Sequence, residues 1–160
     1  MNAAHFHLIT NHLPVIGAGF VFLVLIIGIW FKNGAIQKTA LALFVLVALL
    51  SIPVYLSGGS AEDLVETLPG VSHDAIEVHE ESAVVTLITV EMLGVLALLG
   101  FIFFGRREKL PALFLAVIVF WTLVALVLAT RTSNLGGKIR HPQEMGGSLP
   151  PGGEAEKEKN

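Results

Sequence analysis

Four long apolar runs constrain the fold of this chain more than any other feature. They lie at about residues 13–31, 39–56, 82–104 and 110–130, and each is close to the roughly 20 residues that a helix needs to cross a bilayer. Lipid offers no hydrogen-bond partners to a bare backbone, so we expect all four runs to be helices rather than open strands. The sequence therefore predicts an all-α integral membrane protein.

The composition agrees with this interpretation. Hydrophobic residues make up 54% of the chain and charged residues only 14%, which leaves too little polar surface to cover a water-soluble domain. The net charge of −3 and the lack of a basic motif predict no nucleic-acid partner. The chain has no cysteine, which excludes disulfides, thioether-attached haem and cysteine-ligated iron–sulfur clusters.

The connections between the runs predict an up-down four-helix bundle. Short polar turns join the first run to the second and the third to the fourth, whereas a longer acidic loop, residues 57–81, joins the second to the third. Within that loop the segment "AEDLVETL" follows Ser60 and predicts a short helix outside the membrane. We therefore expect the third and fourth helices to repeat the hairpin arrangement of the first and second.

The ordered domain is expected to cover residues 1–142. The dipeptide Gly136–Gly137 predicts a turn that folds the chain back over the end of the bundle. Residues 143–160, rich in Pro, Gly, Glu and Lys, predict a flexible tail.

Charged residues in the short turns predict the orientation in the membrane. Both short turns are basic, with Lys32, Lys38, Arg106, Arg107 and Lys109. Lys and Arg are enriched in cytoplasmic loops, so both termini and the 57–81 loop are expected on the periplasmic side of a bacterial inner membrane. The basic residues that follow the fourth run weaken this assignment, while the acidic middle loop supports it.

All six histidines fall on the predicted periplasmic side: His5, His7, His12, His73, His79 and His141. His12 lies in the first turn of the first span, and His79 lies about one turn before the third. Facing helices of a bundle commonly hold haem between them. The sequence therefore predicts His12 and His79 as axial ligands of a b-type haem; the alternative is that both are interfacial side chains that anchor helix ends.

Three basic residues follow the fourth span on the same side: Arg131, Lys138 and Arg140. Cationic side chains pair with carboxylates, so these three are candidate partners for haem propionates, with lipid headgroups as the alternative partners. His141 is a candidate substitute ligand or a second-layer partner.

A metal site is a competing use of the histidines. Neutral imidazole binds zinc, copper and iron well. However, "HEES" after Val78 lacks the second histidine of the HExxH zinc motif, so zinc or copper remains an alternative to haem.

Glu91 is unusual because it lies near the middle of the third span. An intramembrane carboxyl is costly and marks a candidate functional residue. It could carry protons or face a quinone or a partner subunit. The alternative is a protonated side chain hydrogen-bonded within the bundle.

Three short elements resemble a family of bacterial four-helix membrane proteins of unknown function. These are "NHLP" with His12 and Pro14, "IEVHEE" with His79, and "LGGKIRHP" with Gly136, Gly137 and His141. The resemblance covers about residues 5–142, and the chain departs from the family pattern at Leu13, where phenylalanine is usual, and in its longer acidic loop. Some members are joined to Rieske domains, so the resemblance implies a redox setting.

The sequence as a whole predicts a membrane b-type haem protein that takes part in electron transfer near the periplasmic face, as a subunit of a larger redox complex rather than as an enzyme. The expected partners are the lipid bilayer, other redox subunits or a periplasmic cytochrome c, and a quinone; a homo-oligomer is left open. The first alternative is a structural accessory subunit without a cofactor, and the second is a histidine-based metal-binding protein.

Overall fold

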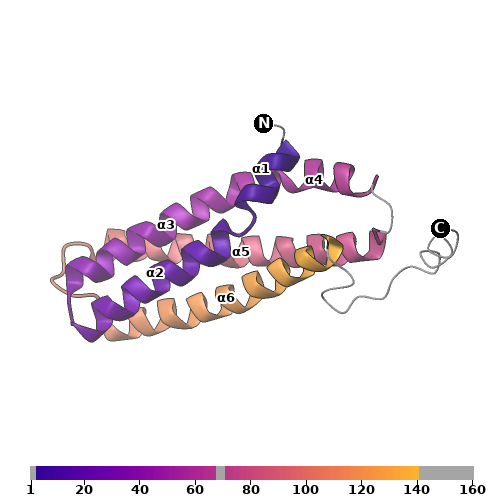
Figure 1. Cartoon of the computed structure of the whole chain (residues 1–160). Coiled ribbons are helices and arrows are strands. Elements are labelled where there is room, and N and C mark those ends of the chain that lie inside the picture. The colour runs from indigo at the N-terminus through magenta and orange to yellow at the C-terminus, as the bar shows by residue number, and fades with distance from the viewer. Residues whose placement is uncertain (1–2, 68–70, 141–160) are drawn as a thin grey trace, which may run out of the picture.

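The structure is a computed structural model that describes residues 3–67 and 71–140. Six helices make up this part of the chain and no strand occurs in it (Figure 1). In chain order they are α1 (Ala3–Thr10), α2 (Leu13–Trp30), α3 (Gly34–Leu56), α4 (Gly58–Val65), α5 (His73–Phe104) and α6 (Ala112–Arg140). His141 and the predicted tail, residues 143–160, lie outside the described residues.

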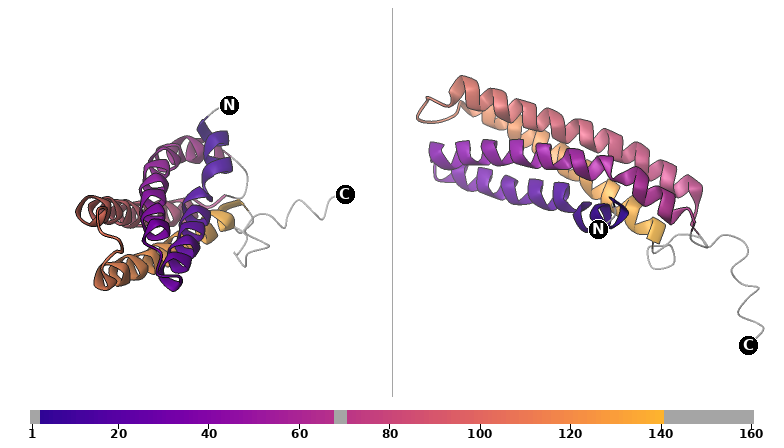
Figure 2. Two further views of the ribbon diagram at one scale, coloured as in Figure 1. Left: turned by 90° about the vertical axis from the view of Figure 1, so that its left-hand side faces the viewer. Right: turned by 90° about the horizontal axis from the view of Figure 1, so that it is seen from above.

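The four long helices form the predicted up-down bundle. α2 packs against α3, α3 against α5, α5 against α6, and α6 closes the ring against α2. The end-on view in Figure 2 shows these four helices around a common axis. Each contains a segment long and apolar enough to cross a membrane. The prediction of a multi-pass, all-α membrane bundle is confirmed.

Large apolar side chains and small residues share the centre of the bundle. Leu25, Leu41, Phe44 and Ile118 are almost completely buried. α5 approaches α3 closely at Gly94, where an added Cβ would collide with the side chain of Ala48. Without a hydrophobic drive between helices in lipid, such close van der Waals contact is a main source of helix association.

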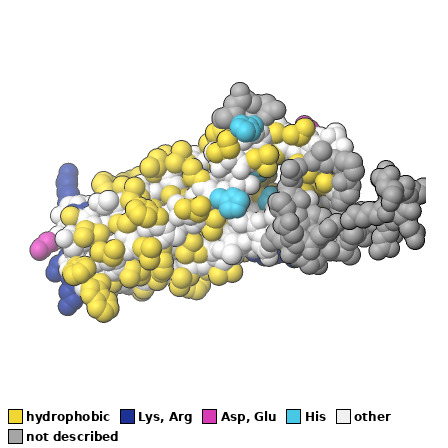
Figure 3. All heavy atoms as spheres, viewed as in Figure 1, with side chains coloured by type: hydrophobic (Ala, Val, Ile, Leu, Met, Phe, Trp, Pro, Cys, Tyr) yellow, Lys and Arg dark blue, Asp and Glu magenta, His cyan; other side chains and the backbone are white. Residues whose placement is uncertain are grey.

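The outer surface is as apolar as the core. Exposed side chains along the bundle include Phe20, Leu23, Leu49, Ile88, Val95, Phe120 and Val127. In Figure 3 hydrophobic side chains cover most of the length of the described surface, whereas Lys and Arg gather at one end. A surface of this kind needs lipid around it, so the four long helices contact the bilayer.

The end of the bundle that carries the two short turns, called here the basic end, is held together by hydrogen bonds between the turns. The side chain of Gln37 is buried; its Nε2 donates to the carbonyl of Gly28 at 3.1 Å and its Oε1 accepts from the amide of Leu110 at 3.2 Å. Lys38 Nζ donates to the carbonyls of Gly105 and Arg107, both at 3.2 Å. One buried amide and one lysine thus link α3 to the α5–α6 turn.

The opposite end, called here the histidine end, is built differently. α1 was not predicted as a helix; it packs against α4, and the pair lies beside the end of α3 (Figure 1). The predicted short helix in the 57–81 loop is confirmed as α4. An isolated helix of this length is not stable in water, so α1 and α4 depend on contacts such as those of buried Ala4, Ala61 and Val65.

α5 and α6 extend well beyond the predicted spans. They have 32 and 29 residues, which at 1.5 Å per residue gives lengths of about 48 and about 44 Å, compared with a hydrocarbon layer of about 30 Å. The prediction of a turn at Gly136–Gly137 is wrong, because α6 continues through both glycines to Arg140. The reason lies in packing: the missing side chain of Gly136 leaves room for the ring of His79 on α5.

Candidate functional site

A cavity of about 660 Å³ opens at the histidine end of the bundle. All six helices contribute to its wall: α1 and α4 on one side, the adjoining parts of α2 and α3 below them, and α5 and α6 opposite. Its lining is mainly apolar and includes Leu8, Val15, Leu87 and Val90, but three imidazoles reach it, those of His7, His12 and His79. A mainly apolar cavity of roughly 300–1,000 Å³ with a few convergent polar groups is typical of cofactor and ligand sites.

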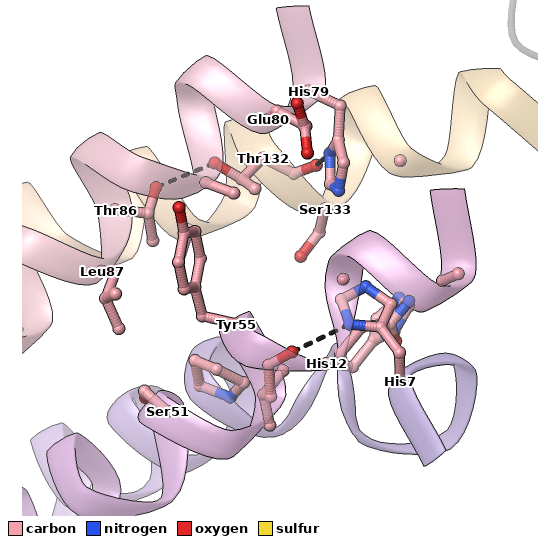
Figure 4. A pocket seen from close by; sticks show the side chains of 18 of the residues that line it. His7, His12, Ser51, Tyr55, His79, Glu80, Thr86, Leu87, Thr132 and Ser133 are labelled. Atoms are coloured by element: carbon pink, nitrogen blue, oxygen red, sulfur yellow. Dashed lines mark hydrogen bonds between the residues drawn. The ribbon is translucent and has the colours of Figure 1, made fainter. Parts of the chain in front are cut away.

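His79 stands on the α5–α6 side of the cavity. Its ring is half-buried, and Nδ1 donates to the backbone carbonyl of Thr132 on α6 at 3.1 Å. A Cβ at Gly136 would lie 3.0 Å from its Cε1 atom, so the ring rests directly on the backbone of α6. Because a carbonyl can only accept, the Nδ1 of the neutral ring carries the proton and Nε2 keeps a free lone pair. Figure 4 shows the ring of His79 directed into the space between the two walls.

Thr132 also joins α6 to α5 below His79. Its hydroxyl lies 2.7 Å from the hydroxyl of Ser82 and 2.8 Å from that of Thr86, and it also donates to the carbonyl of Ser82 at 3.1 Å. Ser82 and Thr86 are buried. This cluster fixes the register of α6 against α5, and with it the carbonyl that orients His79.

His7 stands on the opposite side of the cavity, on α1. Its ring is half-buried, and Nδ1 lies 2.9 Å from the carbonyl of Val54 and 3.2 Å from the hydroxyl of Ser57. The same tautomer argument applies, so the proton is on Nδ1 and the lone pair is on Nε2. His7 also fastens α1 to the end of α3, because Val54 belongs to α3 and α1 has little other contact with that helix.

His12 lines the cavity between α1 and α2, but its side chain is exposed. Its Nδ1 atom contacts the Oδ1 atom of Asn11, the residue next to it in the chain. Figure 4 shows His7 and His12 on the wall that faces His79. The structure therefore brings both sequence-predicted ligands to one cavity and adds a third imidazole, His7.

Two carboxyl groups and a phenol complete the polar lining. Glu62 of α4 and Glu80 of α5 both line the cavity. Tyr55 extends from α3 toward Thr86 across the cavity in Figure 4. These groups belong to three different helices, so the polar part of the cavity depends on the relative placement of α3, α4 and α5.

Of the remaining predicted residues, Arg131, Lys138 and Glu91 are not among those that line this cavity. Arg131 and Lys138 are exposed and do not line it, while Arg140 is the last residue of α6. Their contact with propionates, like the role of His141, stays a prediction. Glu91 lies deeper on α5, and its Oε1 atom is buried without a hydrogen-bond partner among the described residues.

No group of three or more His, Cys, Asp and Glu side chains within residues 3–67 and 71–140 is arranged to hold a metal ion. The pair formed by His73 and Glu66, at 2.9 Å, lies on the surface between α4 and the start of α5. The histidines therefore meet as facing imidazoles at a cavity rather than as a compact metal cluster.

Sequence reasoning missed His7 and Thr132. His7 was not singled out among the six histidines, because its deciding partner is the carbonyl of Val54 on α3, 47 residues away along the chain. A signal for Thr132 was present: Ser82, Thr86 and Thr132 are hydroxyl residues at the ends of otherwise apolar runs, and such residues form hydrogen bonds across membrane helices.

Comparison with protein-family models, with curated proteins and with solved structures finds no match for this chain.

Proposed function

We propose that this protein binds one b-type haem in the cavity at the histidine end and passes electrons on that side of the membrane. One observation carries the proposal: His79 and imidazoles of the facing wall line a single, mainly apolar cavity of about 660 Å³. A bound haem would supply a one-electron redox centre there, while the chain supplies ligands, orientation and exclusion of water.

The side chain of His79 meets the requirements of an axial ligand. Ligating histidines almost always donate the other ring N–H to a carbonyl or carboxylate, which fixes the tautomer and the ring orientation. His79 does this through Nδ1 and the Thr132 carbonyl, and Gly136 leaves space for the ring. Its Nε2 lone pair is available on the cavity side.

The orientation of the basic end supports a periplasmic site. Lys32, Lys38, Arg106, Arg107 and Lys109 all lie in or beside the two short turns, and such residues favour the cytoplasmic side. The cavity would then face the periplasm of a bacterial inner membrane, where a redox subunit, a cytochrome c or a quinone could exchange electrons with the haem. Fusion of a compartment-specific reporter after residue 160 tests the orientation, and a cytoplasmic signal would contradict it.

The absorption spectrum of the full chain, purified in mild detergent after expression with ample haem, tests the cofactor. We expect a Soret band and, on reduction, an α-band, and we expect His79→Ala to lose the six-coordinate spectrum. The matched control is His73→Ala: this histidine is on the same helix but is exposed and absent from the cavity lining, so its spectrum should equal that of the unmodified protein.

The alternatives give different results in the same experiment. A folded protein that stays colourless even after titration with haem would contradict the proposal and favour the accessory-subunit alternative. A colourless protein with stoichiometric zinc or copper by elemental analysis would favour the metal-binding alternative.

A further inference from the structure

We propose that His7, and not His12, is the axial ligand opposite His79, so that the N-terminal helix α1 completes the haem site. This inference rests on the proposed function and names the second ligand of the same site. It differs from the pair that the sequence predicts, because the sequence gives no sign that α1 folds against α3 and α4.

The hydrogen bonds of His7 match those of His79. In both rings Nδ1 donates to a backbone carbonyl of a different helix, that of Val54 for His7 and that of Thr132 for His79. Both rings are half-buried and line the same cavity. Each therefore presents an Nε2 lone pair from a ring whose orientation is set by the backbone of a neighbouring helix, which is the arrangement that ligating histidines show.

The surroundings of His7 add a second similarity. Glycine lies beside each ring: Gly136 beside His79, and Gly58 beside His7, where an added Cβ would be 3.6 Å from the Cε1 atom. His7 and His79 thus stand on opposite walls of one cavity, each with a glycine beside its ring.

His12 lacks these features. Its side chain is exposed, and within the described part of the chain its Nδ1 atom contacts the side chain of the adjacent Asn11. A neighbouring side-chain amide, which can change its rotamer, orients a ring less firmly than a helix carbonyl does. A ligand has to be held by its supporting groups to within a fraction of an ångström, and His7 satisfies this condition where His12 does not.

The pair His7→Met and His12→Met separates the two residues, since both lie on the same wall and receive the same new side chain. Methionine opposite histidine keeps the haem six-coordinate but raises its reduction potential. We expect His7→Met to retain the pigment with a changed ferric spectrum and a raised potential, and His12→Met to match the unmodified protein in both. A normal potential in His7→Met, a shift in His12→Met, or equal shifts in both would overturn the inference.

If His7→Met yields no pigment, His7→Gly provides the second test. Removing the ring leaves space for free imidazole, so added imidazole should restore the six-coordinate spectrum of His7→Gly, and failure of this rescue would overturn the inference. Failure of the proposed function is distinguishable, because there the unmodified protein itself shows no Soret band, whereas here it is pigmented and its spectrum depends on another residue.

Discussion

The two ends of the bundle differ in how the helices are connected. At the basic end the turns are short. Gln37 and Lys38 form three hydrogen bonds with the backbone of the facing α5–α6 turn and one with Gly28 of α2. At the histidine end two short helices are inserted, α5 and α6 continue past the predicted spans, and a cavity of about 660 Å³ remains between the walls. The basic end is thus closely joined, whereas the histidine end contains the cavity that we propose as the haem site. Substitutions at each end can test this difference.

The largest effect on stability is expected at the basic end, where the backbone at Gly34 lies directly against the backbone of Glu108. In Gly34→Ala the new Cβ would collide with the carbonyl oxygen of Glu108, so one of the turns has to move. We expect a loss of about 3 kcal/mol or more in the free energy of unfolding, at the upper end of overpacking effects, measured by thermal or denaturant unfolding in detergent.

The matched control is Gly59→Ala at the histidine end, where an added Cβ meets nothing within 4 Å. Alanine is a better helix former than glycine by roughly 0.5–1 kcal/mol, so this variant should be as stable as the unmodified protein or slightly more stable. Equal losses in the two variants would mean that the ends do not differ in tightness.

A smaller loss is expected for Gln37→Met. The substitution keeps the length of the side chain but leaves the Leu110 amide and the Gly28 carbonyl without their partner. A buried group that loses its hydrogen bond costs about 1–3 kcal/mol, to be measured in the same unfolding experiment. Lys38→Met is the comparison: its bonds are more exposed, so its loss should stay below about 1 kcal/mol.

Thr132→Val probes the hydroxyl cluster between α5 and α6 at the histidine end. It removes the hydroxyl that contacts Ser82 and Thr86 but keeps the backbone carbonyl that orients His79. Hydrogen bonds between membrane helices contribute about 0.6 and at most about 1.7 kcal/mol, so we expect a loss in that range and an unchanged haem spectrum. A changed spectrum would show that the hydroxyl cluster, and not only the carbonyl, orients His79.

The smallest effect on stability is expected for Gly136→Ala. The helix gains up to about 1 kcal/mol from alanine, but the new methyl group would lie 3.0 Å from the Cε1 atom of His79 and displace the ring. Stability should therefore change little while haem affinity, measured by titration with haem, falls several-fold. Asn134→Ala, on an exposed position of the same helix, should leave the affinity unchanged, and equal affinities in both variants would contradict the contact.

Much of the architecture could be predicted from the residues alone. Runs of some 20 apolar residues leave a chain in lipid few choices other than helices, because each backbone group needs a partner within its own helix. The short helix α4 could be anticipated from the segment after Ser60, although it begins at Gly58 and Ser60 lies inside it instead of capping it. The lengths of α5 and α6 could not, because whether a polar segment continues a helix depends on what packs against it, as Gly136 and His79 demonstrate.

The candidate site was predicted only in part. His79 could be singled out because it lies about one turn before the third apolar run, on the same helical face as small and apolar residues. The cavity lining does include it. His12 and His7 could not be ranked, since their difference lies in hydrogen bonds to residues 1 and 47 positions away along the chain. Arg131 and Lys138 have suitable charges but turn away from the cavity lining, and a helical face can be assigned only when the neighbouring helices are known.

The apolar runs by themselves therefore determined that this chain forms four membrane-spanning helices, because burial in lipid acts on each segment separately. Their order along the chain places the basic turns at one end and His7, His12 and His79 at the other. Which imidazoles meet, in which tautomer and around how large a cavity, was settled only by the packing of α1 and α4 against the bundle and of His79 against Gly136. Those contacts join residues that are far apart in the chain, and local sequence patterns do not determine which distant residues come into contact.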